Sequence, residues 1–472
     1  MLQVLGALLF LQAAEEVKPH PCPPPVRIQG ALCATYPVWE NRAAKSGRKI
    51  NLNILILPAT GPEKEPDPVF YLAGGPGQAA TSVAPGIGLL IGKVRAKRDL
   101  VFVDQRGTGG SNPLECKLYG DPPDLRLAAS ELFPASTIAR CREELEKKAD
   151  LHFYTTDLAM DDVDEVRAWL GYSKINLVGG SYGTMAAQVY LRRHESTVRS
   201  VVLIGVAPVD ELIPLHHAMA GQRAVDSVFA ECRADAACHA AYPELEKEFN
   251  EVLARVKSGG KVEIHDPRDG SAVTVQPGLP VLAEGIRHYL YSTDGRSLPK
   301  MIHQAYQGDL APLVQMTVND QISFSRALDY GLLLSVSCSE HVPFIRDDVL
   351  KKETAGTFLG EARVRAQQRA CRQWVQGEVP PDVHKLVNSS VPVLLLSGER
   401  DSVTPPSFGE RVAKGLENGK HVIFPHLSHG NFGLCGAQLV TAFVEAGSTD
   451  KLDLSCVQAT PAPKFEVPTA VR

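Results

Sequence analysis

One glycine-rich segment places a serine where it could act as a nucleophile. Residues 179–183 read Gly-Gly-Ser-Tyr-Gly, so Ser181 follows the apolar run 175–179 and precedes a helical pattern. A strand, a sharp turn and a helix in this order present a serine hydroxyl at a helix N-terminus, where the dipole favours developing negative charge. A tight glycine turn with an incidental serine fits these five residues equally well, so the motif alone decides nothing.

A serine nucleophile needs a base, and the base needs a carboxylate to orient it. In this type of strand–turn–helix architecture the chain order is serine, acid, histidine. Asp401 follows the apolar run 391–398, and His429 follows the run 421–425. Because the carboxyl ends of parallel strands meet at one edge of a sheet, these groups could converge there. We predict Ser181, Asp401 and His429 as a catalytic triad.

Two neighbouring residues compete for these roles. His426 could replace His429 as the base, but His429 lies further into the loop and precedes a glycine. Glu399 could replace Asp401 as the acid, but Glu399 lies closer to the end of its strand. Taken singly, Asp401 and His429 also fit structural roles in a turn and a helix cap.

A second glycine-rich segment, residues 71–79, follows an early strand and reads Tyr-Leu-Ala-Gly-Gly-Pro-Gly-Gln-Ala. Adjacent glycines allow backbone N–H groups to approach a ligand closely. We predict that the N–H groups of Gly75 and Tyr182 hold the oxyanion of a tetrahedral intermediate. One such donor contributes about 2.7–4 kcal/mol in the transition state.

The order of elements along the chain predicts an α/β fold. Apolar, β-branched runs alternate with amphipathic helical patterns, which indicates a mostly parallel sheet covered on both faces. The expected strands are 50–57, 69–73, 100–104, 175–179, 198–205, 391–398 and 421–425. The expected helices include 157–171, 184–194 and 405–417.

The alternation of strands and helices stops after Pro208 and resumes at Val391. The intervening residues read mostly as helices, with a polar interlude at 262–275, so we predict a cap inserted between two strands of the sheet. The expected division is a signal peptide at 1–17, a core in two parts at 18–208 and 390–458, the cap at 209–389 and a Pro-rich flexible tail at 459–472.

The N-terminus and the cysteines favour export. Residues 1–17 contain an apolar stretch of about ten residues followed by small residues, which suits a secretory signal, although no Lys or Arg precedes Lys18. The ten cysteines form no Cys-x-x-Cys pair, so disulfides are favoured over a metal site. Pairing of sequential neighbours would close short loops, but the sequence leaves the connectivity open. Buried reduced thiols in a cytosolic protein are the alternative.

Composition excludes several other classes of protein. The chain has 472 residues and a net charge of −5, with acidic and basic residues interspersed. This balance argues against a nucleic-acid partner, and no basic cluster indicates a membrane surface. No feature of the sequence requires a cofactor or a metal ion.

Three segments together resemble a known family. "PVFYLAGGPGQ" (68–78), "VFVDQRGTGGS" (101–111) and "LVGGSYGT" (177–184) are similar to segments of the secreted tripeptidyl-aminopeptidase-like and prolyl-aminopeptidase-like serine peptidases of the α/β-hydrolase superfamily. The resemblance covers nearly the whole chain and implies an α/β-hydrolase fold with a largely helical, disulfide-bearing cap. It assigns the triad and the oxyanion donors to the residues predicted above, and Arg106 to a scaffold ion pair. Ala73 stands where the prolyl-specific branch usually has histidine, which favours the tripeptidyl-like branch.

An aminopeptidase must also recognise a free ammonium group, which requires a carboxylate in the cap. Glu340, at the end of the run 332–341, is the candidate, since an acidic residue near this position binds the substrate N-terminus in the resembling family. A surface glutamate or an internal salt bridge is the alternative. Further acidic candidates are Asp320, Asp329 and Glu284.

We therefore expect an exported serine peptidase that removes short peptides from the free N-terminus of peptide substrates through an acyl-enzyme on Ser181. A secreted carboxylesterase with the same triad and a purely structural Glu340 is the main alternative. A non-catalytic binding protein on the same fold is disfavoured, because nucleophile, acid, base and oxyanion loop are all present. Epoxide- or haloalkane-type chemistry would require an aspartate at position 181.

Overall fold

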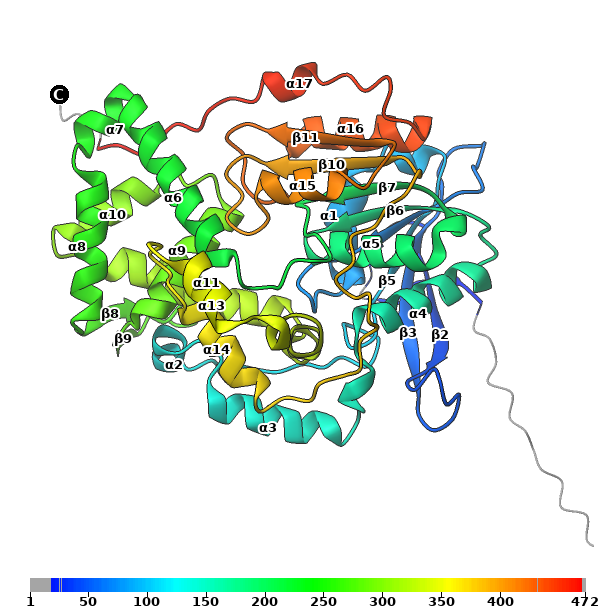
Figure 1. Ribbon diagram of the computed structural model, residues 1–472, viewed down its shortest axis with the longest axis horizontal. Coiled ribbons are helices and arrows are strands. Elements are labelled where there is room, and N and C mark those ends of the chain that lie inside the picture. Colours follow the sequence, from blue (N-terminus) through cyan, green and yellow to red (C-terminus); the bar gives the residue numbers. More distant parts are fainter. Residues whose placement is uncertain (1–17, 25, 27, 431, 469–472) are drawn as a thin grey trace, which may run out of the picture.

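The computed structural model describes residues 18–468, except for positions 25, 27 and 431. The predicted signal peptide, residues 1–17, lies outside the described residues, as do the last four residues of the predicted tail. Figure 1 shows a lobe built around a central sheet and, beside it, a second lobe made mainly of helices. The chain enters the helical lobe after β7 (Val198–Ile204) and returns to the sheet at β10 (Val393–Gly398).

The described residues form a nine-stranded sheet in the order β1-β2-β3-β5-β4-β6-β7-β10-β11. The remaining strands of this sheet are β1 (His20–Pro21), β2 (Leu32–Trp39), β3 (Lys49–Leu57), β4 (Val69–Leu72), β5 (Leu100–Val103), β6 (Ile175–Gly180) and β11 (Gly419–Phe424). Neighbouring strands run parallel from β5 to β11, and the antiparallel pairs lie at the other edge. The predicted fold class, with a mostly parallel sheet, is confirmed.

The central strands are apolar because both faces of the sheet are covered. All residues of β4, β5 and β10 are buried. Neighbours along a strand point to opposite faces, so Phe70 and Leu395 join one hydrophobic cluster while Tyr71 and Leu394 join the other. The two clusters hold the strand ends in place, and the loops predicted to carry the triad start from these ends.

Further helices lie before β7 and after β10, and three of them correspond to the predicted patterns 157–171, 184–194 and 405–417. They are α1 (Ala80–Leu90), α2 (Leu125–Ser130), α3 (Ala135–Glu146), α4 (Thr156–Trp169), α5 (Tyr182–His194), α15 (Pro406–Ala413), α16 (Gly433–Ala446) and α17 (Ser455–Gln458). Single turns lie at η1 (Val94–Ala96), η2 (Leu151–Phe153) and η3 (Glu195–Thr197).

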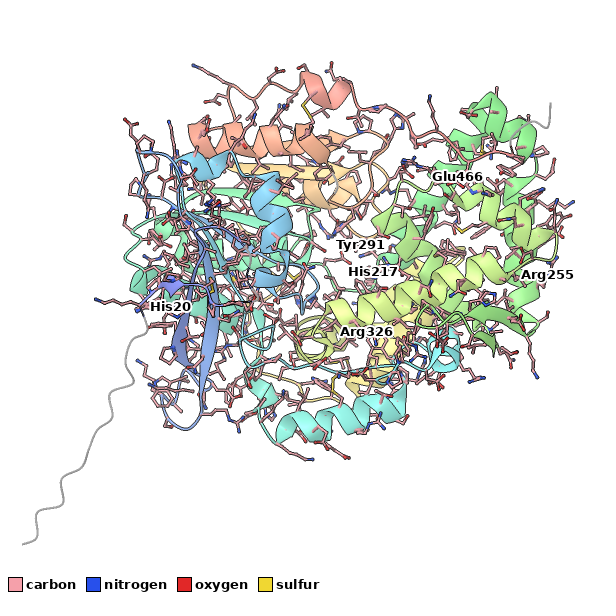
Figure 2. The ribbon with its side chains drawn as sticks, turned by 180° about the vertical axis from the view of Figure 1, so that it is seen from behind. His20, His217, Arg255, Tyr291, Arg326 and Glu466 are labelled. Carbon is pink, nitrogen blue, oxygen red and sulfur yellow. A yellow bond between two sulfur atoms is a disulfide. The ribbon has the colours of Figure 1, made fainter. Side chains whose placement is uncertain are left out.

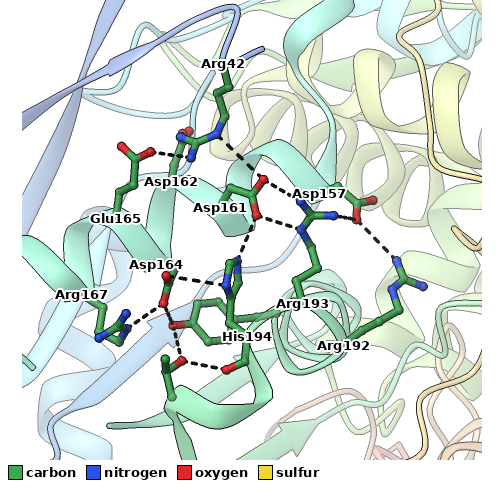
Figure 3. A network of polar contacts seen from close by, with 12 residues as sticks. Arg42, Asp157, Asp161, Asp162, Asp164, Glu165, Arg167, Arg192, Arg193 and His194 are labelled. Carbon is green, nitrogen blue, oxygen red and sulfur yellow. Dashed lines mark hydrogen bonds and ion pairs between the residues drawn. The ribbon is translucent and has the colours of Figure 1, made fainter. Parts of the chain in front are cut away.

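A network of ion pairs fastens α5, the helix that follows Ser181, to α4 (Figure 3). Arg193 of α5 contacts Asp157 at 3.2 Å and Asp161 at 2.7 Å, both on α4. Arg106, from the turn after β5, is fully buried and contacts Asp162 of α4 at 2.7 Å. Arg106 therefore ties the turn after β5 to α4, the helix to which α5 is fastened.

Helices and one hairpin connect β7 to β10. The helices are α6 (His217–Ala234), α7 (Ala236–Ala241), α8 (Leu245–Lys257), α9 (Leu279–Ser292), α10 (Leu298–Tyr306), α11 (Ala311–Ala327), α12 (Tyr330–Val336), α13 (Asp347–Thr354) and α14 (Ala362–Cys371), with single turns η4 (Ser337–His341) and η5 (Val342–Phe344). The polar interlude forms an antiparallel hairpin of β8 (Val262–His265) and β9 (Ala272–Val275). In β8 buried Val262 and Ile264 alternate with exposed residues, the pattern of a strand with one solvated face.

The predicted flexible tail, residues 459–472, is held against the cap over its described part. The hydroxyl of Tyr242 donates to the Glu466 carbonyl at 2.9 Å, and Ser297 Oγ donates to the Glu466 carboxylate at 2.6 Å. Phe465 packs against the larger hydrophobic cluster. Figure 1 shows the last segment crossing from the sheet lobe to the helical lobe, and Figure 2 labels Glu466 there. A Pro-rich segment without regular structure can thus contact the cap through single side chains.

All ten cysteines are paired, each with its neighbour in the sequence. The disulfides are Cys22–Cys33, Cys116–Cys141, Cys232–Cys238, Cys338–Cys371 and Cys435–Cys456. The predicted preference for disulfides over free thiols is confirmed. In the part of the chain that the structure describes, no helix is both long and apolar enough to span a bilayer.

Candidate active site

Ser181 occupies a strained turn between β6 and α5. Its φ of 56° and ψ of −123° place it in a region that non-glycine residues rarely adopt, at a cost of about 1–3 kcal/mol. The glycines around it are required by close approach, because a Cβ on Gly183 would lie 2.0 Å from the carbonyl oxygen of Leu72. The Ser181 N–H donates to the carbonyl of Ile204 at 2.8 Å, which ties the turn to the neighbouring strand β7.

Asp401 and His429 meet at the ends of β10 and β11, as their positions after these strands predict. His429 Nδ1 lies 2.6 Å from Asp401 Oδ2. The other oxygen of Asp401 accepts the N–H groups of Val403 and Thr404 at 2.8 Å each, and Thr404 Oγ1 donates to Oδ2 at 2.7 Å. These contacts hold the carboxylate in one orientation, so that His429 Nδ1 donates to it and Nε2 stays available as a base.

Burial and hydrogen bonding act in opposite directions on Asp401, which is fully buried. Burial alone would raise the pKa of Asp401, but the charge and hydrogen bond of His429 and the hydrogen bonds from Thr404 outweigh it and lower this pKa below its usual value. Asp401 is therefore ionised at neutral pH and can stabilise a protonated His429.

The competing residues lie elsewhere. His426 Nδ1 is 3.3 Å from Glu231 of α6, and the His426 N–H donates to Glu399 Oε2 at 2.9 Å. Neither His426 nor Glu399 is among the described residues that line the cavity next to Ser181.

Tyr291 of α9 contacts both Ser181 and His429, and the sequence did not single it out. Its ring stacks on His429 with centroids 4.4 Å apart and planes 23° from parallel. Burial raises the pKa of Tyr291 to about 12, while a hydrogen bond with Ser181 acts in the opposite direction. Within the described residues, no hydrogen bond joins Ser181 Oγ directly to His429. An aromatic residue in an amphipathic cap helix carries no local signal of such a role.

The two predicted oxyanion donors lie beside Ser181. A Cβ on Gly74 would come within 3.2 Å of Ser181 Cβ, so the backbone at 74–75 passes directly over the nucleophile. Gly75 has a φ of +110°, and its N–H makes no hydrogen bond within the described part of the chain. Tyr182 is the first residue of α5, where N–H groups have no partner inside the helix. Gly75 and Tyr182 therefore offer free donors at the site.

Ser181 and His429 line a cavity of about 540 Å³ between the sheet and the cap. The sheet lobe contributes both oxyanion segments, and the cap contributes α6, α9 and α14 with His217, Arg287 and Arg363. Figure 2 shows His217 and Tyr291 at the boundary between the two lobes. This volume is typical of a small-molecule site.

Glu340, the predicted ligand for a substrate ammonium, does not line this cavity, as far as the structure describes it. It is 2% exposed, and its two oxygens accept the N–H and the hydroxyl of Thr156 at 2.6 and 2.7 Å. Thr156 Oγ1 lies 2.7 Å from the hydroxyl of Tyr182. Burial raises the pKa of Glu340 to about 7, although the Thr156 hydrogen bonds lower it. Glu340 lies in the interior, as its apolar neighbours predict. It contacts Thr156 next to the Tyr182 hydroxyl and does not face the cavity.

The further acidic candidates are also engaged by neighbours. Glu284 Oε1 accepts from Arg287 at 2.7 Å, Asp320 lies 2.6 Å from His288, and Asp329 accepts the Gly109 N–H at 2.8 Å. No Asp or Glu side chain is among the described residues lining the cavity. Clusters of His, Cys, Asp and Glu that could hold a metal ion are absent from the described residues.

Comparisons with known proteins agree with the fold. Residues 67–231 match a family model described as "alpha/beta hydrolase fold", and residues 357–456 match one described as "TAP-like protein". The chain is 26% identical over 485 residues to a protein named "Serine protease Hip1" from Mycobacterium tuberculosis, covering 92% of this chain and 89% of that relative.

Two further proteins show a weaker likeness. Over 190 residues the chain is 27% identical to a "Tripeptidyl aminopeptidase" of Streptomyces lividans, covering 37% of this chain and 35% of the relative. A crystal structure of a proline iminopeptidase from Mycobacterium smegmatis covers 88% of this chain with 16% identity and a TM-score of 0.41, and 98% of that chain is matched.

Proposed function

We propose that this chain, which belongs to the α/β-hydrolase superfamily, is a serine peptidase with Ser181 as nucleophile, His429 as base and Asp401 as the orienting acid. The observation that carries the proposal is the 2.6 Å contact between His429 and Asp401 beside a serine in a strained turn, all at one cavity. The relatives named as serine protease and tripeptidyl aminopeptidase support peptide substrates.

The proposed reaction follows from the positions of these groups. Ser181 Oγ attacks the scissile carbonyl carbon while His429 Nε2 takes the hydroxyl proton, and Asp401 stabilises the resulting imidazolium. The N–H groups of Gly75 and Tyr182 receive the oxyanion. His429 then returns the proton to the leaving amine as the C–N bond breaks. A water molecule, deprotonated by His429, attacks the acyl-enzyme and releases the carboxylic acid and free Ser181.

We further propose that the enzyme acts near the free N-terminus of its peptide substrates. A cavity of about 540 Å³ accommodates a short peptide segment, which supports release of short fragments. Because Thr156 occupies both oxygens of Glu340, we assign Glu340 a supporting position beneath Tyr182 in place of direct contact with the substrate ammonium. Peptides with a free N-terminus are the proposed partners, and the disulfides support export of the protein.

A panel of chromogenic substrates tests this function. It contains free-amine tripeptidyl p-nitroanilides, the same peptides with an acetylated N-terminus, and short p-nitrophenyl esters. We expect hydrolysis of the free-amine anilides, weaker hydrolysis of the blocked ones, and labelling of the wild type but not Ser181→Ala by a fluorophosphonate. Equal rates on free and blocked anilides would reject the aminopeptidase proposal, and an unlabelled wild type would reject the nucleophile.

A carboxylesterase is the second candidate, and one observation favours it. An aminopeptidase has to bind an ammonium group, yet the described lining of the cavity contains no carboxylate. Turnover confined to the p-nitrophenyl esters in the same panel would assign the protein to this class.

A further inference from the structure

The cap wall of the cavity carries a cluster of polar side chains that the proposed reaction does not use. The cluster consists of His217 on α6, Arg287 on α9, and Arg363 and Gln367 on α14, and all four residues line the same cavity as Ser181. We refer to these four residues as the cap arginine cluster. Because they come from three separate helices, their meeting at the cavity is a property of the folded cap.

The two guanidinium groups of this cluster share one contacting carboxylate. Arg287 donates to Glu284 through Nε at 3.0 Å and through Nη2 at 2.7 Å, and Arg363 Nη1 lies 3.5 Å from the same carboxylate. Burial alone would raise the pKa of Glu284, but the charges of Arg287 and Arg363 outweigh it and hold this pKa well below its usual range. One ionised carboxylate therefore contacts two guanidinium groups, and among the described residues no second carboxylate contacts either of them.

Several polar atoms of the cluster are buried with no hydrogen-bond partner among the described residues. They are Arg287 Nη1, Arg363 Nε, His217 Nδ1 and Gln367 Oε1. Buried polar groups in folded proteins almost always have partners, so these atoms need a polar partner, which is either ordered water or a ligand in the cavity. Arg287 is only 4% exposed, which means that bulk water does not hydrate its free N–H group.

Two other carboxylates lie close to the cluster, and the negative charge of Asp320 acts on Arg287. Asp320 contacts His288, and Asp401 contacts His429, so both carboxylates are already engaged. Burial and the charge of Arg287 lower the pKa of His217 well below its ordinary value, which keeps that ring neutral. The free donors thus belong to guanidinium groups, which are the donors best suited to carboxylates.

We propose that the cap arginine cluster binds a carboxylate of the substrate, so that the enzyme prefers peptides with an acidic side chain close to the scissile bond. A monoanion matches the one guanidinium group that has no contacting carboxylate of its own, whereas a phosphate group carries a charge of about −1.5 to −2. The proposal deepens the proposed function, since it names the class of peptide, but the carboxylate preference applies equally to an acyl ester.

Matched substrates test this preference. Tripeptidyl p-nitroanilides carry Glu or Gln at one position at a time, and p-nitrophenyl hemiglutarate is compared with its neutral methyl ester. We expect kcat/KM to be about 10- to 100-fold higher for the carboxylate at one peptide position, the range of a charge-assisted hydrogen bond, and likewise for hemiglutarate. Equal kcat/KM for Glu and Gln at every position, together with equal rates for the two esters, would overturn the proposal.

Two arginine variants on one helix locate the preference. Arg363→Gln should reduce the Glu/Gln ratio about tenfold or more. Arg365→Gln is the matched control, because Arg365 lies outside the cavity lining and pairs with Asp347 and Glu361 at 2.7 and 2.9 Å. A ratio unchanged by Arg363→Gln would overturn the assignment to this cluster. If Arg363→Gln does not fold, inhibition of the wild type by glutarate but not by glutaramide supports the site, and equal inhibition overturns it.

The same data separate the two proposals. If no anilide is cleaved but hemiglutarate is preferred over its methyl ester, the peptidase function fails and the carboxylate site stands. If anilides are cleaved without regard to charge, and the two esters also react equally, the peptidase function stands and the carboxylate site fails.

Discussion

The two walls of the cavity differ in how completely their charged side chains are paired. On the sheet wall, the oxygens of Asp401 accept hydrogen bonds from Val403, Thr404 and His429. On the cap wall, Arg287 and Arg363 each keep a buried nitrogen without a partner among the described residues. The sheet wall is thus organised before any substrate arrives, as electrostatic stabilisation of a transition state requires, whereas a ligand has to complete the cap wall.

The difference follows from how each wall is built. The loops of Asp401 and His429 leave neighbouring parallel strands, β10 and β11, whose register places their ends side by side. The cap wall assembles from α6, α9 and α14, whose positions depend on side-chain packing. Substitutions on the sheet wall should therefore lower the rates on all substrates alike. Substitutions on the cap wall should change the preference of the enzyme for one substrate over another.

The largest effect is expected for Asp401→Asn. The variant removes the charge that orients and stabilises His429 while keeping the shape of the side chain, so kcat should fall about 10⁴-fold on esters and amides alike. Steady-state kinetics with both substrate types measures this, and thermal unfolding controls for stability. A fall of less than tenfold would mean that Asp401 is not the acid of the triad.

A smaller loss is expected for Gly205→Ala. Gly205 has a φ of +66°, and a Cβ there would lie 2.7 Å from Cε1 of His429, so the alanine should displace the base. A displacement of about 1 Å can cost about 100-fold in kcat. Gly171→Ala is the control, because Gly171 has a φ of +80° with nothing within 4 Å of the added Cβ. If Gly171→Ala lowers kcat as much as Gly205→Ala does, the loss comes from backbone strain and not from the clash with His429.

Glu340 connects the two walls, since it belongs to η4 of the cap and contacts Tyr182 through Thr156. Its pKa is raised to about 7 in the folded protein, mainly by burial. Below the pKa that Glu340 has in the unfolded chain, the raised pKa stabilises the folded protein to its full extent. This stabilisation is lost as the pH rises through about 7, the pKa of Glu340 in the folded protein. Between pH 4.5 and 7.5 the free energy of unfolding of the wild type should fall by about 3 kcal/mol relative to Glu340→Gln. Urea unfolding measures this, and a difference independent of pH would contradict it.

The smallest effect is expected for Tyr291→Phe. The variant keeps the ring that stacks on His429 but loses the hydrogen bond with Ser181, so kcat should fall about 2- to 10-fold. The ratio of rates on acidic and neutral substrates should stay constant, because Tyr291 is not part of the cap arginine cluster. An increase in kcat would mean that the hydroxyl restrains Ser181 in place of orienting it.

The sequence predicted the sheet well because strand signals are local. Buried parallel strands require continuous apolar runs, and each of the seven expected runs forms a strand. Two features of the structure were not predicted, because they depend on contacts between segments and not on local composition. The tail reads as flexible, yet Glu466 binds Tyr242 and Ser297 of the cap. The polar interlude gave no clear strand signal, yet it forms a hairpin whose alternate residues are buried.

Glu340 shows what the sequence could not predict about the site. Its apolar neighbours correctly indicate an inward position, but burial does not reveal which internal space a side chain faces. Tyr291 and Arg363 carry no local signal, because an aromatic or basic residue on an amphipathic helix is common. The order of serine, acid and histidine is informative because each stands at a strand end, where the topology constrains position.

The sequence by itself determined the mostly parallel sheet, the strained turn at Ser181 and the strand ends that carry Asp401 and His429. The physical reason is that periodicity, glycine turns and strand order act over short stretches of chain. Only the tertiary structure decided that Glu340 bonds Thr156, that Tyr291 stacks on His429, and that arginines line the cap wall. These contacts join helices distant in the sequence, and their geometry depends on packing that no single segment encodes.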